Sequence, residues 1–220
     1  MSLEVIEFET APNPTVSIII LHGLGADGND FVPIAQDLDL ASVGPVRFVF
    51  PSAPTRPVTI NGGYLMRAWY DILGTEVARR EDEAGLRASQ AQIQALIANE
   101  RARGIAANRI VLAGFSQGCA MTFMAGLRHG ERLAGLLGMS GYLPLADLTA
   151  TERSAANAGV PIFQAHGSAD PMITMARATA SRDALIALGY PVEWHAYPMP
   201  HSVCPQEIVD MNRWLLRVLA

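Results

Sequence analysis

The chain has 220 residues, of which 50% are hydrophobic, and a formal net charge of −5 at pH 7. This acidic balance, without any basic cluster, argues against nucleic acid as a partner. The longest strongly apolar run, Ile18 to Leu21, is far too short to cross a bilayer, so integral membrane association is not expected. The length suits a single α/β domain over residues 1–220.

The N-terminal segment and the two cysteines indicate a cytoplasmic protein. Met1 to Glu7 is acidic and lacks the basic and apolar regions of a secretory signal. The two cysteines, Cys119 and Cys204, have no metal-type spacing, and we interpret both as free thiols in a reducing compartment.

Apolar runs in the first half predict strands that alternate with short helical or irregular segments. The expected strands are Leu3–Phe8 at an edge, Val16–Leu21 buried on both faces, and Val46–Phe50 ended by Pro51. A short helix is expected over Asp30–Leu38. Pro51 to Gly63 shows no periodicity and is predicted to be loop.

The second half continues the alternation, which predicts an α/β fold with a mostly parallel sheet and helices on both faces. Helices are expected over Asp82–Arg103, Cys119–Leu127, Asp147–Asn157, Met175–Leu188 and Gln206–Leu219. Strands are expected over Arg109–Ala113, Leu133–Met139, Pro161–His166 and Val192–Tyr197.

The most informative stretch is Ile110–Ala120, in which a β-branched run leads into Gly-x-Ser-x-Gly and then into a helix. A strand, a one-residue turn and a helix hold the serine in a strained backbone conformation above the sheet edge. Gly114 and Gly118 allow the strand and helix to pass closely. Because both flanking elements are present, the pattern predicts a nucleophile elbow with Ser116 at its apex.

A serine hydroxyl needs a base within hydrogen-bond reach and a further group that orients the base. In parallel sheets, such groups collect at the carboxyl ends of the strands. Asp170 and His201 each follow the end of a predicted strand. The order Ser116, Asp170, His201 is the one expected after a nucleophile elbow, so these residues are the predicted catalytic set.

Alternatives exist for the acid and for the base. Asp170 precedes Pro171, and Asp-Pro often only starts a turn. Asp147 is the rival acid, although its position suits a helix N-terminus better. His22 and His166 precede glycines at strand ends, and we interpret them as structural or supporting residues.

Gly23 to Gly28 matches G-x-G-x-x-G after a strand, which is also the pattern of a dinucleotide site. Asp27 and Asp30 place negative charge where a pyrophosphate would bind, and the next strand lacks the acid that would hold a ribose. We therefore interpret this loop as part of an oxyanion hole. Its expected donors are the backbone N–H groups of Leu24 and Gln117.

A hydrophobic set occupies the irregular stretch from Pro51 to about Gly74. Its members are Leu65, Met66, Trp69 and Leu73. Burial in the core is one interpretation. The functional interpretation is that they line an open acyl groove beside the catalytic residues.

Five segments resemble signatures of the small carboxylesterase / acyl-protein thioesterase (phospholipase–carboxylesterase) family: Leu21–Asp30, Trp69–Ile72, Ala113–Gly118, His166–Asp170 and His201-Ser202. The resemblance implies an α/β-hydrolase without a large cap domain. It also implies a Ser116–Asp170–His201 triad that hydrolyses carboxylic esters or thioesters. Cys119 departs from the glycine often found at its position, which affects packing rather than chemistry.

The resulting hypothesis is a serine carboxylesterase that hydrolyses short- to medium-chain esters through an acyl-enzyme on Ser116. An acyl-protein thioesterase or lysophospholipase with the same triad is the alternative, and a non-catalytic hydrolase-fold binding protein is a more distant one. The expected partner is a small ester or thioester, and no metal or cofactor is expected. The sequence leaves a homodimer open.

Overall fold

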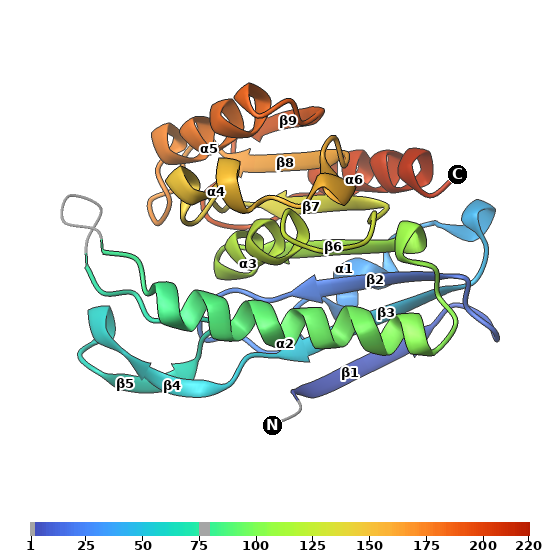
Figure 1. Ribbon diagram of the computed structural model, residues 1–220, viewed down its shortest axis with the longest axis horizontal. Helices are drawn as coiled ribbons and strands as arrows, with labels where there is room; N and C mark the ends of the chain where they lie inside the picture. Colours follow the sequence, from blue (N-terminus) through green and yellow to red (C-terminus); the bar gives the residue numbers. More distant parts are fainter. Residues whose placement is uncertain (1–2, 75–79) are drawn as a thin grey trace.

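Strands and helices alternate along the chain and build one central sheet flanked by helices (Figure 1). The computed structural model describes residues 3–74 and 80–220, so Met1, Ser2 and residues 75–79 of the predicted domain lie outside it. Within the described chain, seven strands follow the order β1-β3-β2-β6-β7-β8-β9. Their bounds are β1 Glu4–Glu9, β2 Val16–Leu21, β3 Val46–Ser52, β6 Ile110–Phe115, β7 Gly135–Met139, β8 Ile162–Gly167 and β9 Val192–Tyr197.

The sheet is mostly parallel, as predicted. β1 pairs antiparallel with β3, and every other neighbouring pair in this sheet is parallel. The carboxyl ends of the parallel strands therefore lie at a common edge, where loops from several strands can meet.

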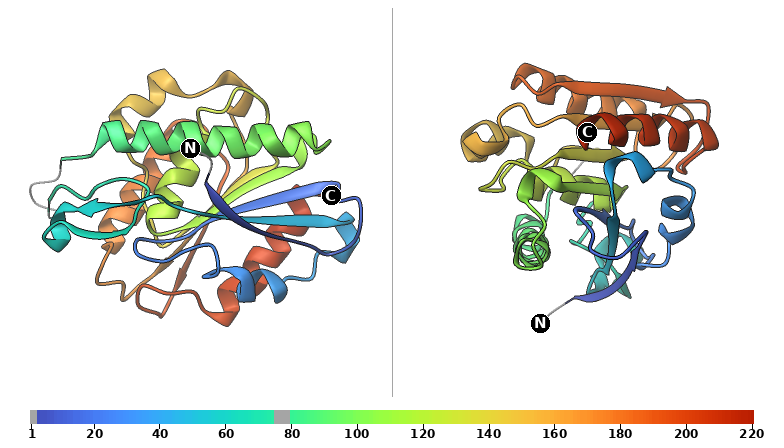
Figure 2. Two further views of the ribbon diagram at one scale, coloured as in Figure 1. Left: turned by 90° about the horizontal axis from the view of Figure 1, so that it is seen from below. Right: turned by 90° about the vertical axis from the view of Figure 1, so that its right-hand side faces the viewer.

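Helices cover both faces of the sheet, which confirms the α/β-hydrolase-like fold class (Figure 2). The α-helices of the described chain are α1 Val32–Gln36, α2 Glu83–Ala102, α3 Gln117–Gly126, α4 Ala146–Glu152, α5 Met175–Ala187 and α6 Pro205–Val218. Side chains of α1 and α6 pack into one hydrophobic cluster, whereas those of α2, α3 and α5 pack into the other. Within residues 3–74 and 80–220, no helix combines the length and apolar character needed to span a membrane.

β2 shows why its run of apolar residues is nearly continuous, broken only by Ser17. Ile18 and Ile20 point into the cluster under α1 and α6, and Ile19 and Leu21 point into the opposite cluster. Successive side chains of a strand face opposite sides, so a strand covered on both faces is apolar at almost every position; the exception in β2 is Ser17, a small side chain that is itself fully buried.

Two predictions for residues 51–67 are wrong. β3 does not end before Pro51 but continues to Ser52. β2 pairs with β3 only as far as Val49. Pro51 therefore has no neighbouring strand on that side, and its missing N–H interrupts no β2–β3 hydrogen bond. The irregular stretch from Pro51 to about Gly74, for which the sequence predicts no strand, contains a hairpin, β4 Thr55–Val58 with β5 Tyr64–Arg67.

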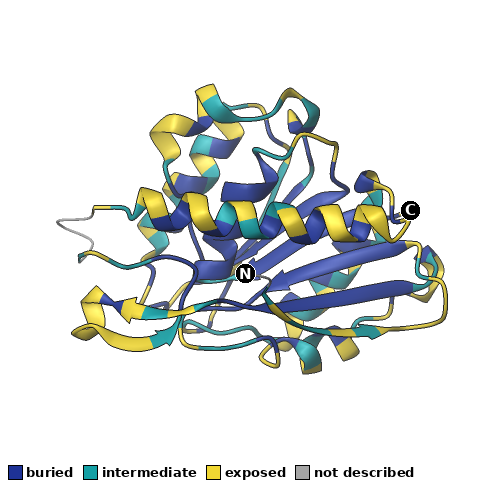
Figure 3. Ribbon diagram, turned by 60° about the horizontal axis from the view of Figure 1, so that its bottom comes forward, coloured by how far each residue is buried: buried dark blue, intermediate teal, exposed yellow. Residues whose placement is uncertain are grey.

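This hairpin stands at the same end of the molecule as the carboxyl ends of the sheet and is largely exposed (Figures 1 and 3). Gly62 and Gly63 turn the chain between its strands, both with positive φ, at 66° and 79°. Strands this short, with Pro57 inside one of them, give almost no period-2 signal, which explains why the sequence pattern missed them.

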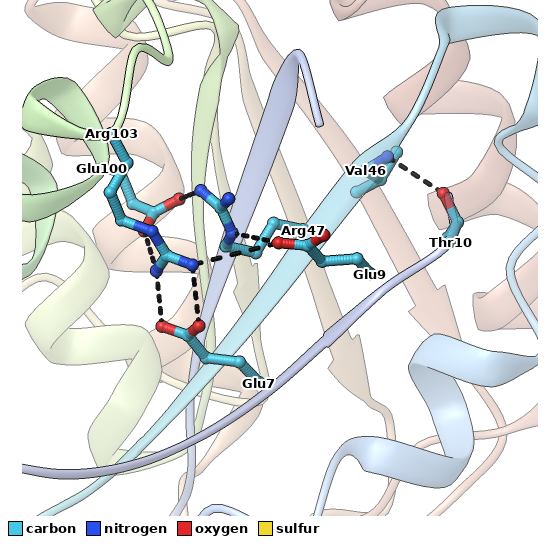
Figure 4. Close-up of polar contacts among 7 residues, drawn as sticks. All are labelled: Glu7, Glu9, Thr10, Val46, Arg47, Glu100 and Arg103. Atoms are coloured by element: carbon cyan, nitrogen blue, oxygen red, sulfur yellow. Dashed lines mark hydrogen bonds and ion pairs between the residues drawn. The ribbon is translucent and has the colours of Figure 1, made fainter. Parts of the chain in front are cut away.

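A partly buried ionic network joins the edge strand β1 to β3 and α2 (Figure 4). Arg47 of β3 donates to Glu9 at 2.9 Å and to the fully buried Glu100 of α2 at 3.0 Å. Arg103 adds bonds to Glu7 and Glu100, at 2.7 Å and 2.9 Å. The network supplies each buried charge with a partner and ties β1, β3 and α2 together.

Candidate active site

The turn between β6 and α3 holds Ser116 in the strained conformation that the sequence predicts. Its φ is 55° and its ψ is −115°, an unusual backbone geometry for a residue with a side chain. A Cβ at Gly114 would lie 2.2 Å from the carbonyl oxygen of Gly118, and one at Gly118 would lie 2.0 Å from that of Leu21. The two glycines are therefore required by the close passage of β6, α3 and the end of β2.

Asp170 and His201 meet at the carboxyl ends of β8 and β9. The Nδ1 of His201 donates to Oδ2 of Asp170 at 2.6 Å. The other carboxylate oxygen, Oδ1, accepts the backbone N–H groups of Met172 and Ile173 at 2.8 Å and 2.9 Å. The carboxylate thus makes the turn that Asp-Pro suggests and also holds the imidazole, with its side chain fully buried.

The rival acid Asp147 lies elsewhere. It is exposed in the first turn of α4, where a carboxylate suits the positive end of the helix dipole. His22 and His166 are both buried and bonded to backbone carbonyl oxygens, Gly23 at 2.6 Å and Ile173 at 2.8 Å. Their contacts match the supporting roles expected of them.

Ser116 and His201 line the same cavity, which has a volume of about 400 Å³. The ring of Phe115 lies against that of His201, with centroids 4.7 Å apart, and so supports the imidazole from the side of the elbow. A cavity of this size is within the usual range for small-molecule sites, about 300–1,000 Å³.

Leu24 and Gln117, the expected oxyanion-hole residues, line this cavity beside Ser116. The loop that carries Leu24 runs directly against the elbow, since a Cβ at Gly23 would lie 3.4 Å from that of Ser116. Gln117 is the first residue of α3, where a backbone N–H has no partner within the helix. Among the backbone hydrogen bonds of the described loops and turns, none is donated by the N–H of Leu24, so both amides are available to the proposed oxyanion role.

The side chain of Gln117 has a second task that the sequence did not reveal. Its Oε1 accepts the backbone N–H of Trp69 at 3.0 Å, and its Nε2 donates to the backbone carbonyl oxygen of Tyr70 at 2.8 Å. The indole of Trp69 donates to the carbonyl oxygen of His22 at 2.9 Å. These bonds join the elbow, the glycine-rich loop after β2 and the segment after β5.

His22 completes this support. Its Nε2 accepts the backbone N–H of Ala53 at 2.9 Å, so its proton is on Nδ1, which donates to Gly23. Burial lowers the pKa of His22, and this favours the neutral ring that the two bonds require. The His22 ring thus links the glycine-rich loop to the end of β3 through two hydrogen bonds.

The prediction that Leu65, Met66, Trp69 and Leu73 line the cavity is wrong, although other residues of the stretch from Pro51 to about Gly74 do line it. The indole of Trp69 is 0% exposed in the core, and Leu65 and Leu73 are 63% and 40% exposed. Met66 accepts from the Asn61 amide at 3.4 Å, and none of the four residues lines the cavity. The prediction for Trp69 fails because its ring is buried in the core and its indole N–H already has a hydrogen-bond acceptor there.

The cavity wall is built from other apolar residues that the sequence analysis missed. They are Ile60, Tyr70, Ile72, Tyr142, Met172 and Ile173. The hydroxyl groups of Tyr70 and Tyr142 lie 2.5 Å apart and join two parts of the wall. Tyr142 lies shortly after β7, and Met172 and Ile173 directly follow Asp170-Pro171. Such a position after a strand end is the one sequence signal that favours a place in the cavity wall.

Cys119 fits behind the elbow because two glycines leave room for it. A Cβ at Gly141 or Gly138 would lie 2.5 Å or 2.7 Å from its sulfur. Both Cys119 and Cys204 are free thiols. Over the described ranges, no group of three His, Cys, Asp or Glu side chains is arranged to hold a metal ion.

The whole chain is similar to known hydrolases. A family profile described as Phospholipase/Carboxylesterase matches residues 2–219. The protein named acyl-protein thioesterase 1 of Yarrowia lipolytica is 38% identical over 206 residues, which cover 91% of each chain. Among solved structures, Arabidopsis thaliana SOBER1 has a TM-score of 0.88 at 29% identity, over 93% of this chain and 99% of that one. Zea mays acyl-protein thioesterase 2 has a TM-score of 0.85 at 28% identity, over 98% and 99%.

Proposed function

This chain belongs to the phospholipase/carboxylesterase family and is a carboxylic ester hydrolase, and we propose that it cleaves acyl thioesters of proteins through an acyl-enzyme on Ser116. The observation that carries the proposal is the convergence of a strained serine and an Asp170-bound His201 on one cavity with a largely apolar wall. The thioester substrate class rests on the names of the relatives, two of which are acyl-protein thioesterases.

The proposed reaction begins when the Ser116 hydroxyl attacks the acyl carbonyl while His201 takes its proton. The carbonyl oxygen becomes negative and is bound by the N–H groups of Leu24 and Gln117. Collapse of this intermediate expels the thiolate, which receives the proton from His201, and the acyl group remains on Ser116. Water, deprotonated by His201, then releases the acid and regenerates the serine.

Asp170 has an orienting role in this mechanism. Its bond to Nδ1 of His201 leaves Nε2 free to exchange protons with Ser116, and its charge stabilises the imidazolium that forms. The two backbone N–H bonds to the other oxygen fix the carboxylate in place.

The second candidate is a carboxylesterase of short- and medium-chain oxygen esters, which the same residues would perform. It is favoured by the modest cavity volume of about 400 Å³. In both cases the apolar wall that includes Ile60, Ile72 and Tyr142 receives the acyl chain.

A matched substrate panel separates the two candidates. S-acyl and O-acyl forms of the same cysteine- and serine-containing peptide, with acyl chains from butyryl to palmitoyl, are compared by kcat/KM. Each value is divided by the rate of hydroxide hydrolysis, which removes the intrinsic reactivity of the thioester. A normalised preference for long S-acyl peptides of tenfold or more supports the thioesterase. Turnover restricted to short O-acyl substrates supports the carboxylesterase, and Ser116→Ala serves as the inactive control.

A further inference from the structure

The cavity wall carries a carboxylate that the proposed mechanism does not use. Asp30 lines the cavity together with Leu24 and Ala26 of the glycine-rich loop. Among the described residues of this wall, Asp30 is the only carboxylate and no arginine is present. The chain contains no lysine, so all 16 of its Lys and Arg residues are arginines, and none of those described offers a cation to this wall.

The Asp30 carboxylate is also unpaired. No described residue forms a hydrogen bond or an ion pair with it, whereas the neighbouring Asp27 accepts the Asn29 backbone N–H at 2.8 Å. Asp30 is exposed at the rim of the cavity; partial desolvation raises the pKa of its carboxyl, His22 opposes the shift and the charge of Asp27 adds to it. Because His22 is bonded as a neutral ring, Asp30 presents an uncompensated negative charge to the cavity.

Its position assigns this charge to one side of the reaction. The next residue, Phe31, packs its ring against Phe115 with centroids 5.9 Å apart, and Phe115 packs against His201. The segment that carries Asp30 thus packs beside Phe115 and His201, and we assign Asp30 to the side of the cavity where the proposed mechanism returns a proton to the departing thiol. The residues that would receive the acyl chain, such as Ile72 and Tyr142, form the apolar part of the wall.

We propose that Asp30 selects the charge of the leaving group: it favours acylated thiols that carry a positive charge near the scissile bond and disfavours those that carry a negative one. The natural class would be an acylated cysteine beside arginine or lysine in a peptide, rather than a phosphate-bearing thiol. This inference rests on the proposed function, because it concerns the leaving group of that reaction.

The expected effect is moderate and sensitive to salt. A charge at the edge of an open cavity interacts through a medium of intermediate dielectric constant, so a gain of about fivefold to tenfold in kcat/KM is expected for a cation. A comparable penalty is expected for an anion. Both effects shrink as ionic strength rises, because the Debye length falls from about 10 Å at 0.1 M to about 3 Å at 1 M.

The test uses three thioesters with the same butyryl group and different leaving groups. They are S-butyrylthiocholine, its uncharged carbon isostere with a 3,3-dimethylbutyl thiol, and S-butyryl-3-mercaptopropionate. For the intact protein, kcat/KM is expected to fall in that order at low salt, and the three values are expected to converge at 1 M salt. In Asp30→Asn, the ratio of cationic to neutral substrate is expected to drop to about one.

Asp37→Asn is the matched control, since Asp37 is exposed on the same segment, away from the cavity, and its loss changes net charge equally. This control is expected to keep the wild-type ratio. Two results would overturn the inference and leave the hydrolase function intact. One is equal kcat/KM values for the three thioesters in wild type, and the other is a ratio of cationic to neutral substrate that stays at the wild-type value in folded Asp30→Asn. Failure of the wild type to hydrolyse even the neutral thioester would instead overturn the proposed function. If Asp30→Asn does not fold, the wild-type ratios and their dependence on salt decide.

Discussion

The imidazole of His201 and the carboxylate of Asp170 are joined by a 2.6 Å bond between Nδ1 and Oδ2, although the two residues belong to loops after different strands. Because the second oxygen of Asp170 is held by two backbone N–H groups, the bond fixes both the tautomer and the orientation of the ring. The other ring nitrogen, Nε2, is the one that the proposed mechanism uses as the base for Ser116.

Replacing Asp170 with asparagine is expected to lower kcat by about 10⁴-fold, because the amide cannot enforce the correct imidazole tautomer. Far-UV circular dichroism should remain that of wild type, since asparagine keeps an oxygen for the backbone N–H bonds. Asp147→Asn, on the exposed first turn of α4, should leave kcat unchanged. A large loss in Asp147→Asn and none in Asp170→Asn would show that the acid is misassigned.

A second prediction separates the cavity wall from the core beneath it. Ile72→Ala removes part of the wall and should lower kcat/KM for octanoyl esters more than for acetyl esters. Trp69→Phe should lower stability but keep the ratio of the two, because the indole is buried and donates to the His22 carbonyl. Rates across an aryl ester series and urea unfolding provide the measurements. A changed ratio in Trp69→Phe together with an unchanged one in Ile72→Ala would reverse the assignment.

The thiols should differ sharply in reactivity. Cys119 is fully buried, and burial raises the pKa of its thiol, whereas Cys204 is only half-buried. A thiol reagent should therefore modify one group in the native protein and two in the unreduced, denatured protein. Cys204→Ser should remove the native reaction. Finding no free thiol after denaturation would demonstrate a disulfide.

Glu207 should make stability depend on pH. Both of its carboxylate oxygens are buried without a hydrogen bond to a described residue, and burial raises its pKa to about 8 despite the nearby Cys204 N–H. The folded state therefore keeps a proton that the unfolded state, with a pKa of 4.5, has released. The corresponding stabilisation is complete below pH 4.5 and is lost as the pH rises to about 8.

Glu207→Gln removes this titration, so its stability relative to wild type should rise between pH 5 and pH 8 (roughly the range over which the carboxyl would ionise on unfolding). Urea unfolding at several pH values measures the difference. Glu131→Gln, an exposed residue paired with Arg101, is the control and should show no such trend. A difference between Glu207→Gln and wild type that is constant with pH would contradict a raised pKa.

The sequence was most informative where a local pattern of residues is compatible with only one local structure. Near-continuous apolar runs such as Val16–Leu21 predict buried strands, and the glycines around Ser116 predict an elbow, because few alternatives satisfy the same local constraint. The sequence was least informative over residues 51–73. There, a short hairpin and the burial of Trp69 depend on contacts with distant residues such as Gln117 and His22. No local pattern records such contacts.

The same distinction applies to the candidate active site. Asp170 and His201 could be predicted because parallel strands bring their carboxyl ends together. The wall residues Tyr142 and Met172 could not, since their place in the cavity depends on how the loops after β7 and β8 pack against each other.

The role of Ser116 is tested most directly by active-site labelling. The intact protein is incubated with an organophosphonate and digested, and the modified peptide is identified by mass spectrometry while residual hydrolysis is followed. The proposed mechanism predicts one adduct per chain, on Ser116, with loss of activity in proportion to labelling and no labelling of Ser116→Ala. An adduct on another serine, or hydrolysis that persists in Ser116→Ala, would contradict it.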